Sequence, residues 1–375
     1  MKLRNLLSLF CLLFSFKLQA LGLNDLSILV PLPKIAEAPL MLSPYTEGLQ
    51  GTLLSKKNYN KLFKLVVDKS NEEVWRDQLK VVAIRLDPCF VEATGPLACR
   101  RQIRLVWQPM IEKENEFTTR DASLHSFYEF SDEEFSAILK EWKTWSNTDR
   151  NLPLSIHPLL KKEGLSGKHW EKLRSIVLKY CGEKNLVRMT SMGLSGSEQL
   201  WVFSGIDINP GTKLSKEIMI PRIQTTIQTI TQSSFDSHEF WGALTPAPNA
   251  DLEFNLLVED SMFFKKRNTE TEVRKVVKSY LSFENPKKHN TGTLDCASCH
   301  LTSMTHQWTL ANYPNLKWDA EFADVKYQNA LNLENTTLNK VNPHQFRIFG
   351  YFGKEPAISQ RVINETAEVF DFLKL

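Results

Sequence analysis

The sequence lacks an excess of charge of either sign. Its 46 lysine and arginine residues stand against 43 aspartate and glutamate residues, and three of the basic residues lie in the first 20 positions, which hold no acidic residue. The remainder of the chain is therefore close to neutral. Because a nucleic-acid-binding protein presents a basic face to the phosphate backbone, we expect no nucleic-acid partner.

Long apolar runs are also scarce, and the clearest one lies near the amino terminus. Leu6–Phe16 is an apolar stretch of eleven residues that follows the basic Lys2 and Arg4 and precedes the small Ala20. This order is typical of a secretory signal peptide, and the run is too short to span a bilayer. We expect residues 1–20 to be cleaved, which leaves a periplasmic or secreted protein without a transmembrane segment. An uncleaved anchor is the alternative.

Cysteine is rare, with six residues in the chain, of which five follow the expected signal peptide. Export places them in an oxidising compartment, where disulfides persist. Cys89 and Cys99 are close in sequence and each adjoins an expected strand, so we predict a disulfide between them. Cys181 is predicted to be a buried, inert thiol. The last two, Cys296 and Cys299, belong to a motif discussed below.

The apolar periodicity alternates between the values typical of strands and of helices, which predicts an α+β protein. In one expected strand, Ile103, Leu105 and Trp107 alternate with Arg104 and other residues, as in a half-buried strand. Strands are predicted at 81–86, 102–107, 186–192, 200–206, 217–223 and 252–258, and helices at 131–145, 170–180, 270–283 and 359–374.

About 355 residues after signal cleavage are too many for one ordinary core, so two domains are expected. A composition change near residue 268 marks the boundary, where Thr269 and Glu272 form a capping box before an amphipathic helix. We predict a mixed helix and strand domain of unknown role over 21–267. A mainly α-helical domain is predicted over 268–375.

The motif Cys296-Ala297-Ser298-Cys299-His300 has the spacing C-x-x-C-H. Two thiols at this spacing can add to the two vinyl groups of a haem, and the adjacent His300 can then bind the iron. A zinc site with His306 would be strained, because His300 adjoins Cys299. A thioredoxin-like dithiol lacks its strand–helix context, and a plain disulfide across two residues is strained.

The motif and its flanking helices resemble a single-haem c-type cytochrome domain of about 105 residues, although only the five-residue motif is specific. The resemblance implies one covalent haem c, with thioether bonds at Cys296 and Cys299 and His300 as the proximal iron ligand. It also implies electron transfer with a redox partner protein or a small electron carrier. The amino-terminal domain resembles no characterised family, and no catalytic residue is assigned.

The sequence departs from the commonest pattern of that family at the distal ligand, which is a methionine well downstream. Met304 is the only methionine after the motif, and in a helix it lies on the same side as His300. His289, in an irregular segment before the motif, and His344, in a later loop, are the better distal candidates. An open site is the further alternative.

Four other histidines show no metal-ligand spacing and are interpreted as structural: His125, His157, His169 and His238. The leading functional hypothesis is an exported monohaem c-type cytochrome that transfers single electrons. The alternatives are a haem peroxidase-like enzyme with an open or displaceable sixth ligand, and a non-redox exported protein with a structural haem or zinc site. Residues 286–375 hold nine basic and nine acidic residues, so no net charge steers a partner to them.

Overall fold

The computed structural model describes residues 21–90, 99–145, 148–194, 200–231, 243–245, 252–338, 346 and 348–374. The expected signal peptide, residues 1–20, lies outside these ranges, as does His344. Within the described ranges we find no helix with the length and apolar character needed to span a bilayer.

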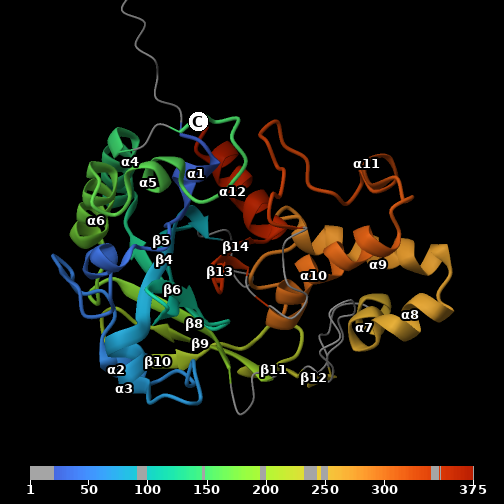
Figure 1. The fold of residues 1–375 in the computed structure, drawn as a ribbon, viewed down its shortest axis with the longest axis horizontal. Coiled ribbons are helices and arrows are strands. Elements are labelled where there is room, and N and C mark those ends of the chain that lie inside the picture. The colour runs from blue at the N-terminus through green and yellow to red at the C-terminus, as the bar shows by residue number, and fades with distance from the viewer. Residues whose placement is uncertain are drawn as a thin grey trace, which may run out of the picture.

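A large antiparallel sheet organises the described part of the chain (Figure 1). Its strand order is β1-β4-β5-β7-β8-β9-β11-β12, with β6 beside β5 and β10 beside β9. The bounds are β1 (Ser27–Leu29), β4 (Leu79–Phe90), β5 (Arg100–Lys113), β6 (Glu116–Thr119), β7 (Ser123–Phe130), β8 (Leu186–Leu194), β9 (Leu200–Ile208), β10 (Ser215–Glu217), β11 (Ile227–Thr231) and β12 (Ala243–Thr245). Two hairpins stand apart, β2 (Glu47–Gly48) with β3 (Gly51–Thr52) and β13 (Phe349–Phe352) with β14 (Glu355–Ile358).

The helices fall into groups around the sheet, with α4 and α6 on one side and α7 to α10 on the other (Figure 1). Their bounds are α1 (Leu23–Leu26), α2 (Lys56–Tyr59), α3 (Asn71–Glu73), α4 (Asp132–Trp145), α5 (Pro158–Glu163), α6 (Lys168–Tyr180), α7 (Leu252–Glu259), α8 (Ser261–Arg267), α9 (Glu270–Glu284), α10 (Cys296–Asn312), α11 (Trp318–Glu321) and α12 (Gln360–Phe372). A 3₁₀ helix covers Ile35–Leu40, and a π-helical turn covers Val74–Gln78.

Four of the six predicted strands and all four predicted helices are confirmed. The strand predicted at 217–223 is wrong, because β10 ends at Glu217. Pro221 has no N–H to donate to a ladder, and Arg222 adopts a positive φ of 70° that turns the chain. The strand predicted at 252–258 is helix α7, whose buried residues face α9; a short apolar run does not separate the two structures by periodicity.

The last helix, α12, packs on α1, on strand β4 of the sheet and on α9. Its apolar side chains Val362, Ile363, Ala367 and Phe370 belong to the core that the sheet forms with α4 and α6. A second core joins α7 to α10 with residues of β9 and β11. The mixed fold with a large antiparallel sheet is confirmed, whereas the cytochrome-like domain over 268–375 stays a prediction.

The sheet is covered on both faces, which differs from the half-buried strand expected at 102–107. Gln102, Arg104 and Gln108 in β5 are buried along with the apolar residues that alternate with them. Part of the cover comes from β13, where the amide of Gln108 donates to the carbonyl of Tyr351 at 2.8 Å and accepts from its N–H at 2.7 Å. Segments more than 200 residues apart in sequence thus share one interface.

The predicted disulfide between Cys89 and Cys99 is present. It closes the chain between β4 and β5, which are neighbours in the sheet. Cys181 is fully buried, and burial raises the pKa of its thiol well above the usual range, as expected for an inert core residue.

Replacing both Cys89 and Cys99 with serine should lower the free energy of unfolding by about 2–3 kcal/mol, because the short loop they close becomes free in the unfolded chain. Equilibrium urea unfolding measures the change. Wild-type protein treated with a reductant is the matched control and should unfold at the same urea concentration as the double variant. Equal stability of the oxidised wild type and the variant would contradict the prediction.

Candidate functional site

The C-x-x-C-H motif forms the first turn of α10, and a buried polar clamp holds that turn. Asp295 is the N-cap, and its carboxylate accepts hydrogen bonds from the N–H of Ser298 at 3.0 Å and from its hydroxyl at 2.7 Å. Gln228 of β11 donates to Asp295 at 2.9 Å and accepts from the N–H of Ala297 at 2.8 Å. The turn is therefore fixed to the sheet as well as capped.

Cys296, Cys299 and His300 lie on one face of α10, since residues three and four apart are neighbours on a helix. All three line a cavity between α10, the sheet and α12. The empty space, including the open mouth, is about 1230 Å³, which exceeds the 300–1,000 Å³ typical of small-molecule pockets, part of it being solvent at the mouth. The structure thus brings the three motif side chains into one ligand-sized space.

The sheet supplies the wall that faces the motif. In the register, Val106 of β5, His125 of β7 and Thr190 of β8 are cross-strand neighbours. Because side chains alternate across a strand, every second residue of β5, β7 and β8 faces the same way. The cavity-lining residues of these strands include Arg104, Val106, Ser123, His125, Phe127, Arg188, Thr190 and Met192.

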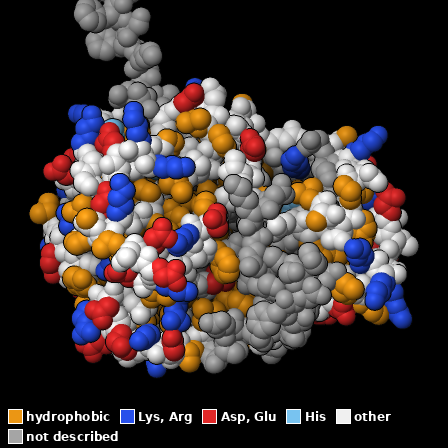
Figure 2. Space-filling view, in the orientation of Figure 1, with side chains coloured by type: hydrophobic (Ala, Val, Ile, Leu, Met, Phe, Trp, Pro, Cys, Tyr) orange, Lys and Arg blue, Asp and Glu red, His pale blue; other side chains and the backbone are white. Residues whose placement is uncertain are grey.

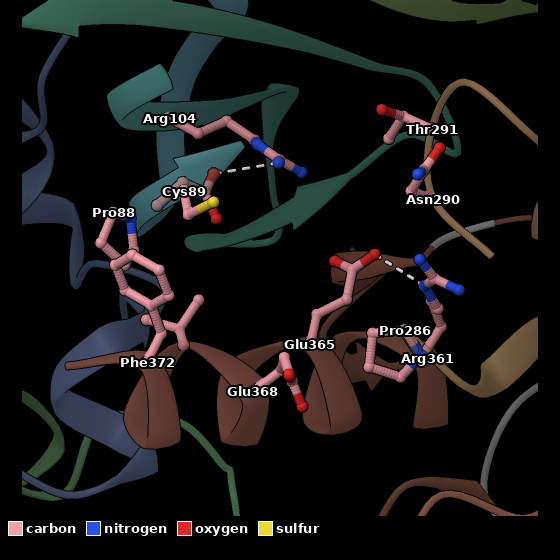
Figure 3. A pocket seen from close by; sticks show the side chains of 12 residues that line it. Pro88, Cys89, Arg104, Pro286, Asn290, Thr291, Arg361, Glu365, Glu368 and Phe372 are labelled. Carbon is pink, nitrogen blue, oxygen red and sulfur yellow. Dashed lines mark hydrogen bonds and ion pairs between the residues drawn. The ribbon is translucent and has the colours of Figure 1, made fainter. Parts of the chain in front are cut away.

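A cluster of buried charges lies beneath α12, where the cavity adjoins a second pocket that Figure 3 shows, and Arg104, Arg361 and Glu365 line both. Glu365 accepts from Arg361 at 2.6 Å and from Arg85 at 3.0 Å, and Arg104 pairs with Asp87 at 2.9 Å. Burial would raise the pKa of Glu365, but the guanidinium groups of its arginine neighbours outweigh burial and lower it to about 2. These pairs join three guanidinium groups to two carboxylates, and a third carboxylate, that of Glu368, lines the second pocket.

The surroundings of the two thiols keep them neutral. Burial raises the pKa of Cys296 and of Cys299 to about 12, with nearby Asp295 adding to the effect. A redox-active dithiol or a nucleophilic cysteine has a lowered thiol pKa instead. The site therefore differs electrostatically from a thioredoxin-like centre.

A hydrogen bond to Phe346 orients the ring of His300. Its Nδ1 donates to the carbonyl oxygen of Phe346, so in the neutral imidazole the lone pair is on Nε2. The N–H of Phe346 donates to the carboxylate of Asp121 at 3.1 Å, and the rings of Phe203 and His300 pack edge-on with their centroids 4.7 Å apart. A metal-binding histidine is held in the same way by an outer acceptor.

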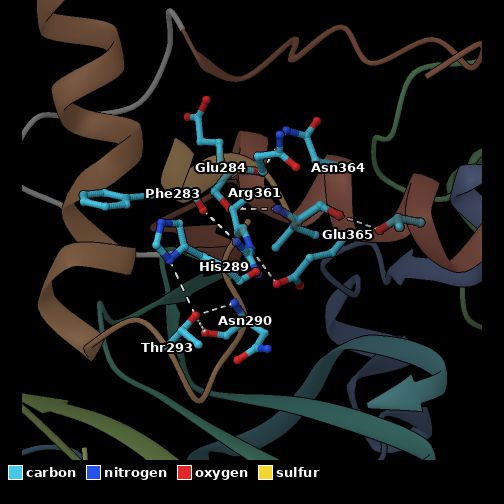
Figure 4. Close-up of polar contacts among 12 residues, drawn as sticks. Phe283, Glu284, His289, Asn290, Thr293, Arg361, Asn364 and Glu365 are labelled. Carbon is cyan, nitrogen blue, oxygen red and sulfur yellow. Dashed lines mark hydrogen bonds and ion pairs between the residues drawn. The ribbon is translucent and has the colours of Figure 1, made fainter. Parts of the chain in front are cut away.

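His289, the first predicted distal ligand, lies beside the cavity in the loop before the motif. Its neighbours Asn290 and Thr291 line the cavity, whereas its own ring packs against Phe283 at 5.4 Å (Figure 4). Burial, together with the positive charges of Arg222 and other cations nearby, lowers its pKa to about 4. The second candidate, His344, falls outside the described residues, so its role stays a prediction.

The residues of the zinc alternative are not gathered at one point. His306 points away from the cavity, where its Nδ1 lies 3.0 Å from the carboxylate of Glu284 and its ring stacks on Tyr280. Met304 is buried in the core beneath α10 and does not line the cavity. Among the described residues, no group of three or more His, Cys, Asp or Glu side chains is arranged to hold a metal ion.

Sequence reasoning did not anticipate the residues of the facing wall. Arg104 occupies the polar side of an alternating strand, which the pattern indicates as solvent-facing, whereas the structure buries it. His125 carried a weak signal, since it occupies the alternating position between Ser123 and Phe127. Arg361 and Glu365, four apart on the terminal helix, read equally well as a surface pair.

Replacing Glu365 with glutamine should remove one component of acid sensitivity. The folded-state pKa of about 2 lies below the ordinary value of 4.5, so the carboxylate contributes stability above pH 4.5 that is lost as the pH falls toward 2. The variant should be less stable at neutral pH and lack this loss. Urea unfolding from pH 7 to 2 measures it, with the exposed Glu355→Gln variant as control. If the free energy of unfolding varied with pH in the same way for the wild type and both variants, the prediction would be wrong.

Replacing Gln228 with alanine should lower the free energy of unfolding by about 1–3 kcal/mol, because the N–H of Ala297 and one oxygen of Asp295 lose buried partners. The Ile227→Thr variant, at a partly exposed position of the same strand, should change it far less. Urea unfolding of both variants tests this. An equal change in the free energy of unfolding of both variants would show that the hydrogen bonds of Gln228 do not stabilise the fold.

No family model, no curated protein and no solved structure matches this chain. The site is therefore interpreted from its own residues.

Proposed function

We propose that this chain is an exported c-type cytochrome that carries one covalently attached haem and transfers single electrons. The observation that carries the proposal is the common cavity of Cys296, Cys299 and His300, all on the first turn and a half of one helix. Two thiols and one imidazole in this order are the attachment set of a c-type haem. A zinc site would require a fourth ligand, and His306 is engaged elsewhere.

The residues present suit the group chemically. Cys296 and Cys299 are held as neutral thiols, the form whose S–H adds across a vinyl group to give a thioether. His300 would bind the iron through Nε2, since its Nδ1 proton is committed to the carbonyl of Phe346. When bound, a haem supplies one-electron redox chemistry at its iron.

The walls of the cavity would hold the rest of the porphyrin. Apolar lining residues such as Val106, Phe127 and Phe349 would exclude water from its ring. The end of the cavity beneath α12, where Arg85, Arg104 and Arg361 outnumber the acidic groups they pair with, would bind the anionic propionates. The apolar and cationic regions of the cavity thus match the apolar ring and the anionic propionates of a haem.

In this proposal the protein acts outside the cytoplasm and exchanges electrons with a partner. The Cys89–Cys99 disulfide supports an oxidising compartment, periplasmic or extracellular. Charged side chains of both signs intermingle on the face shown in Figure 2, and residues 286–375 carry no net charge. A partner protein or small electron carrier would therefore dock through local contacts near the mouth of the cavity rather than through long-range steering.

Expression of the full chain with a cytochrome maturation system should give a red protein whose mass under denaturing conditions is increased by one haem. The Cys296→Ser and Cys299→Ser variants should each lose one thioether, and the double variant should lose covalent haem entirely. The Cys181→Ala variant is the control, because it removes a thiol outside the cavity and should keep the haem.

The spectrum then separates electron transfer from the peroxidase alternative. Stable reduced and oxidised forms without appreciable peroxide turnover are expected. Absence of added mass and colour in the wild type would contradict the haem proposal, and rapid peroxide turnover would instead favour the enzymatic function.

A further inference from the structure

We propose that His125, on the central strand β7, supplies the distal ligand of the haem, so that the iron is bound between the sheet and α10. This inference rests on the haem attachment proposed above. It starts from the cavity itself, which His125 and His300 line from different elements. One imidazole comes from strand β7 of the sheet and the other from α10, so the two can approach a bound group from different elements.

The register of the sheet sets the spacing between the two walls. His125 pairs with Thr190, and Thr190 pairs with Gly205, two residues along β9 from Phe203. Two strand spacings and two residues along a strand put the Cα atoms of His125 and Phe203 roughly 12 Å apart. Because the ring of Phe203 packs against His300, His125 lines the cavity at a distance from the proximal histidine and is not its immediate neighbour.

His125 is also the longest side chain of its row. Its cross-strand neighbours in the ladder are Val106, Thr190 and, one strand further, Gly205. Val106 and Thr190 have shorter side chains than an imidazole and Gly205 has none, so none of the three reaches as far from its strand as His125. His125 itself is only partly buried, although the residues before and after it in β7 are buried.

Few described residues of the cavity can compete for the iron. Histidine, cysteine, methionine and tyrosine are the usual axial ligands, and once the three motif residues are assigned, the described lining offers His125 and Met192. Met192 is buried in the apolar core with Phe203. It therefore lies on the same side as His300. His289, the earlier candidate, packs its ring on Phe283 instead.

The test uses the full chain matured with haem, examined by electronic absorption and electron paramagnetic resonance of the ferric form. The wild type should be low-spin with two imidazole ligands. The His125→Ala variant should keep its covalent haem, shown by mass, but lose the low-spin signal, and added imidazole should restore it. His169→Ala is the matched control and should leave the spectrum unchanged, since His169 of α6 pairs with Glu163 of α5 outside the cavity.

A second variant covers failure of the alanine variant to fold. His125→Met should keep six ligands, show the charge-transfer band of methionine-bound ferric haem and have a higher midpoint potential. The assignment of His125 is wrong if the low-spin signal persists in His125→Ala. It is also wrong if the signal is lost in Met192→Leu or His289→Ala instead. In both cases the haem proposal stands. A wild type without covalent haem overturns both.

Discussion

The hydrogen bonds between Gln228 and the first turn of α10 are the constraint on which the site depends. They are fully buried and join β11 to the residues that cap and begin the motif helix. Without them, the helix could shift relative to the sheet while keeping its internal hydrogen bonds. One side-chain amide thus satisfies a donor and an acceptor at the start of the helix, and together with the apolar core beneath α10 it places Cys296 and His300 relative to the sheet.

A second constraint joins the terminal helix to the same sheet. Glu365 is held between Arg361 on its own helix and Arg85 on β4, in surroundings that burial alone would make unfavourable for a charge. Buried ion pairs contribute little net stability, but breaking one leaves an uncompensated charge. Their effect here is positional, because they hold α12 against β4 and bring three guanidinium groups together on the cavity wall.

Local patterns predicted most of the secondary structure and failed where long-range packing decided the outcome. The capping box at Thr269 and Glu272 and the apolar stripe behind it placed α9 correctly, since caps and helical periodicity involve neighbours in sequence. The run 252–258 folded as a helix because α9 was available to cover it. The second face of β5 is buried because β13 returns from the end of the chain, which no pattern within the strand can indicate.

The sequence by itself determined the chemistry and the spacing of the motif. Cys296, Cys299 and His300 share one face because a helix repeats every 3.6 residues, a property of the local backbone. Only the tertiary structure decided which histidine shares a cavity with them. His289 is near in sequence yet turns toward Phe283, whereas His125 is distant and lines the cavity. Strand pairing and register, which join segments far apart along the chain, decide such contacts.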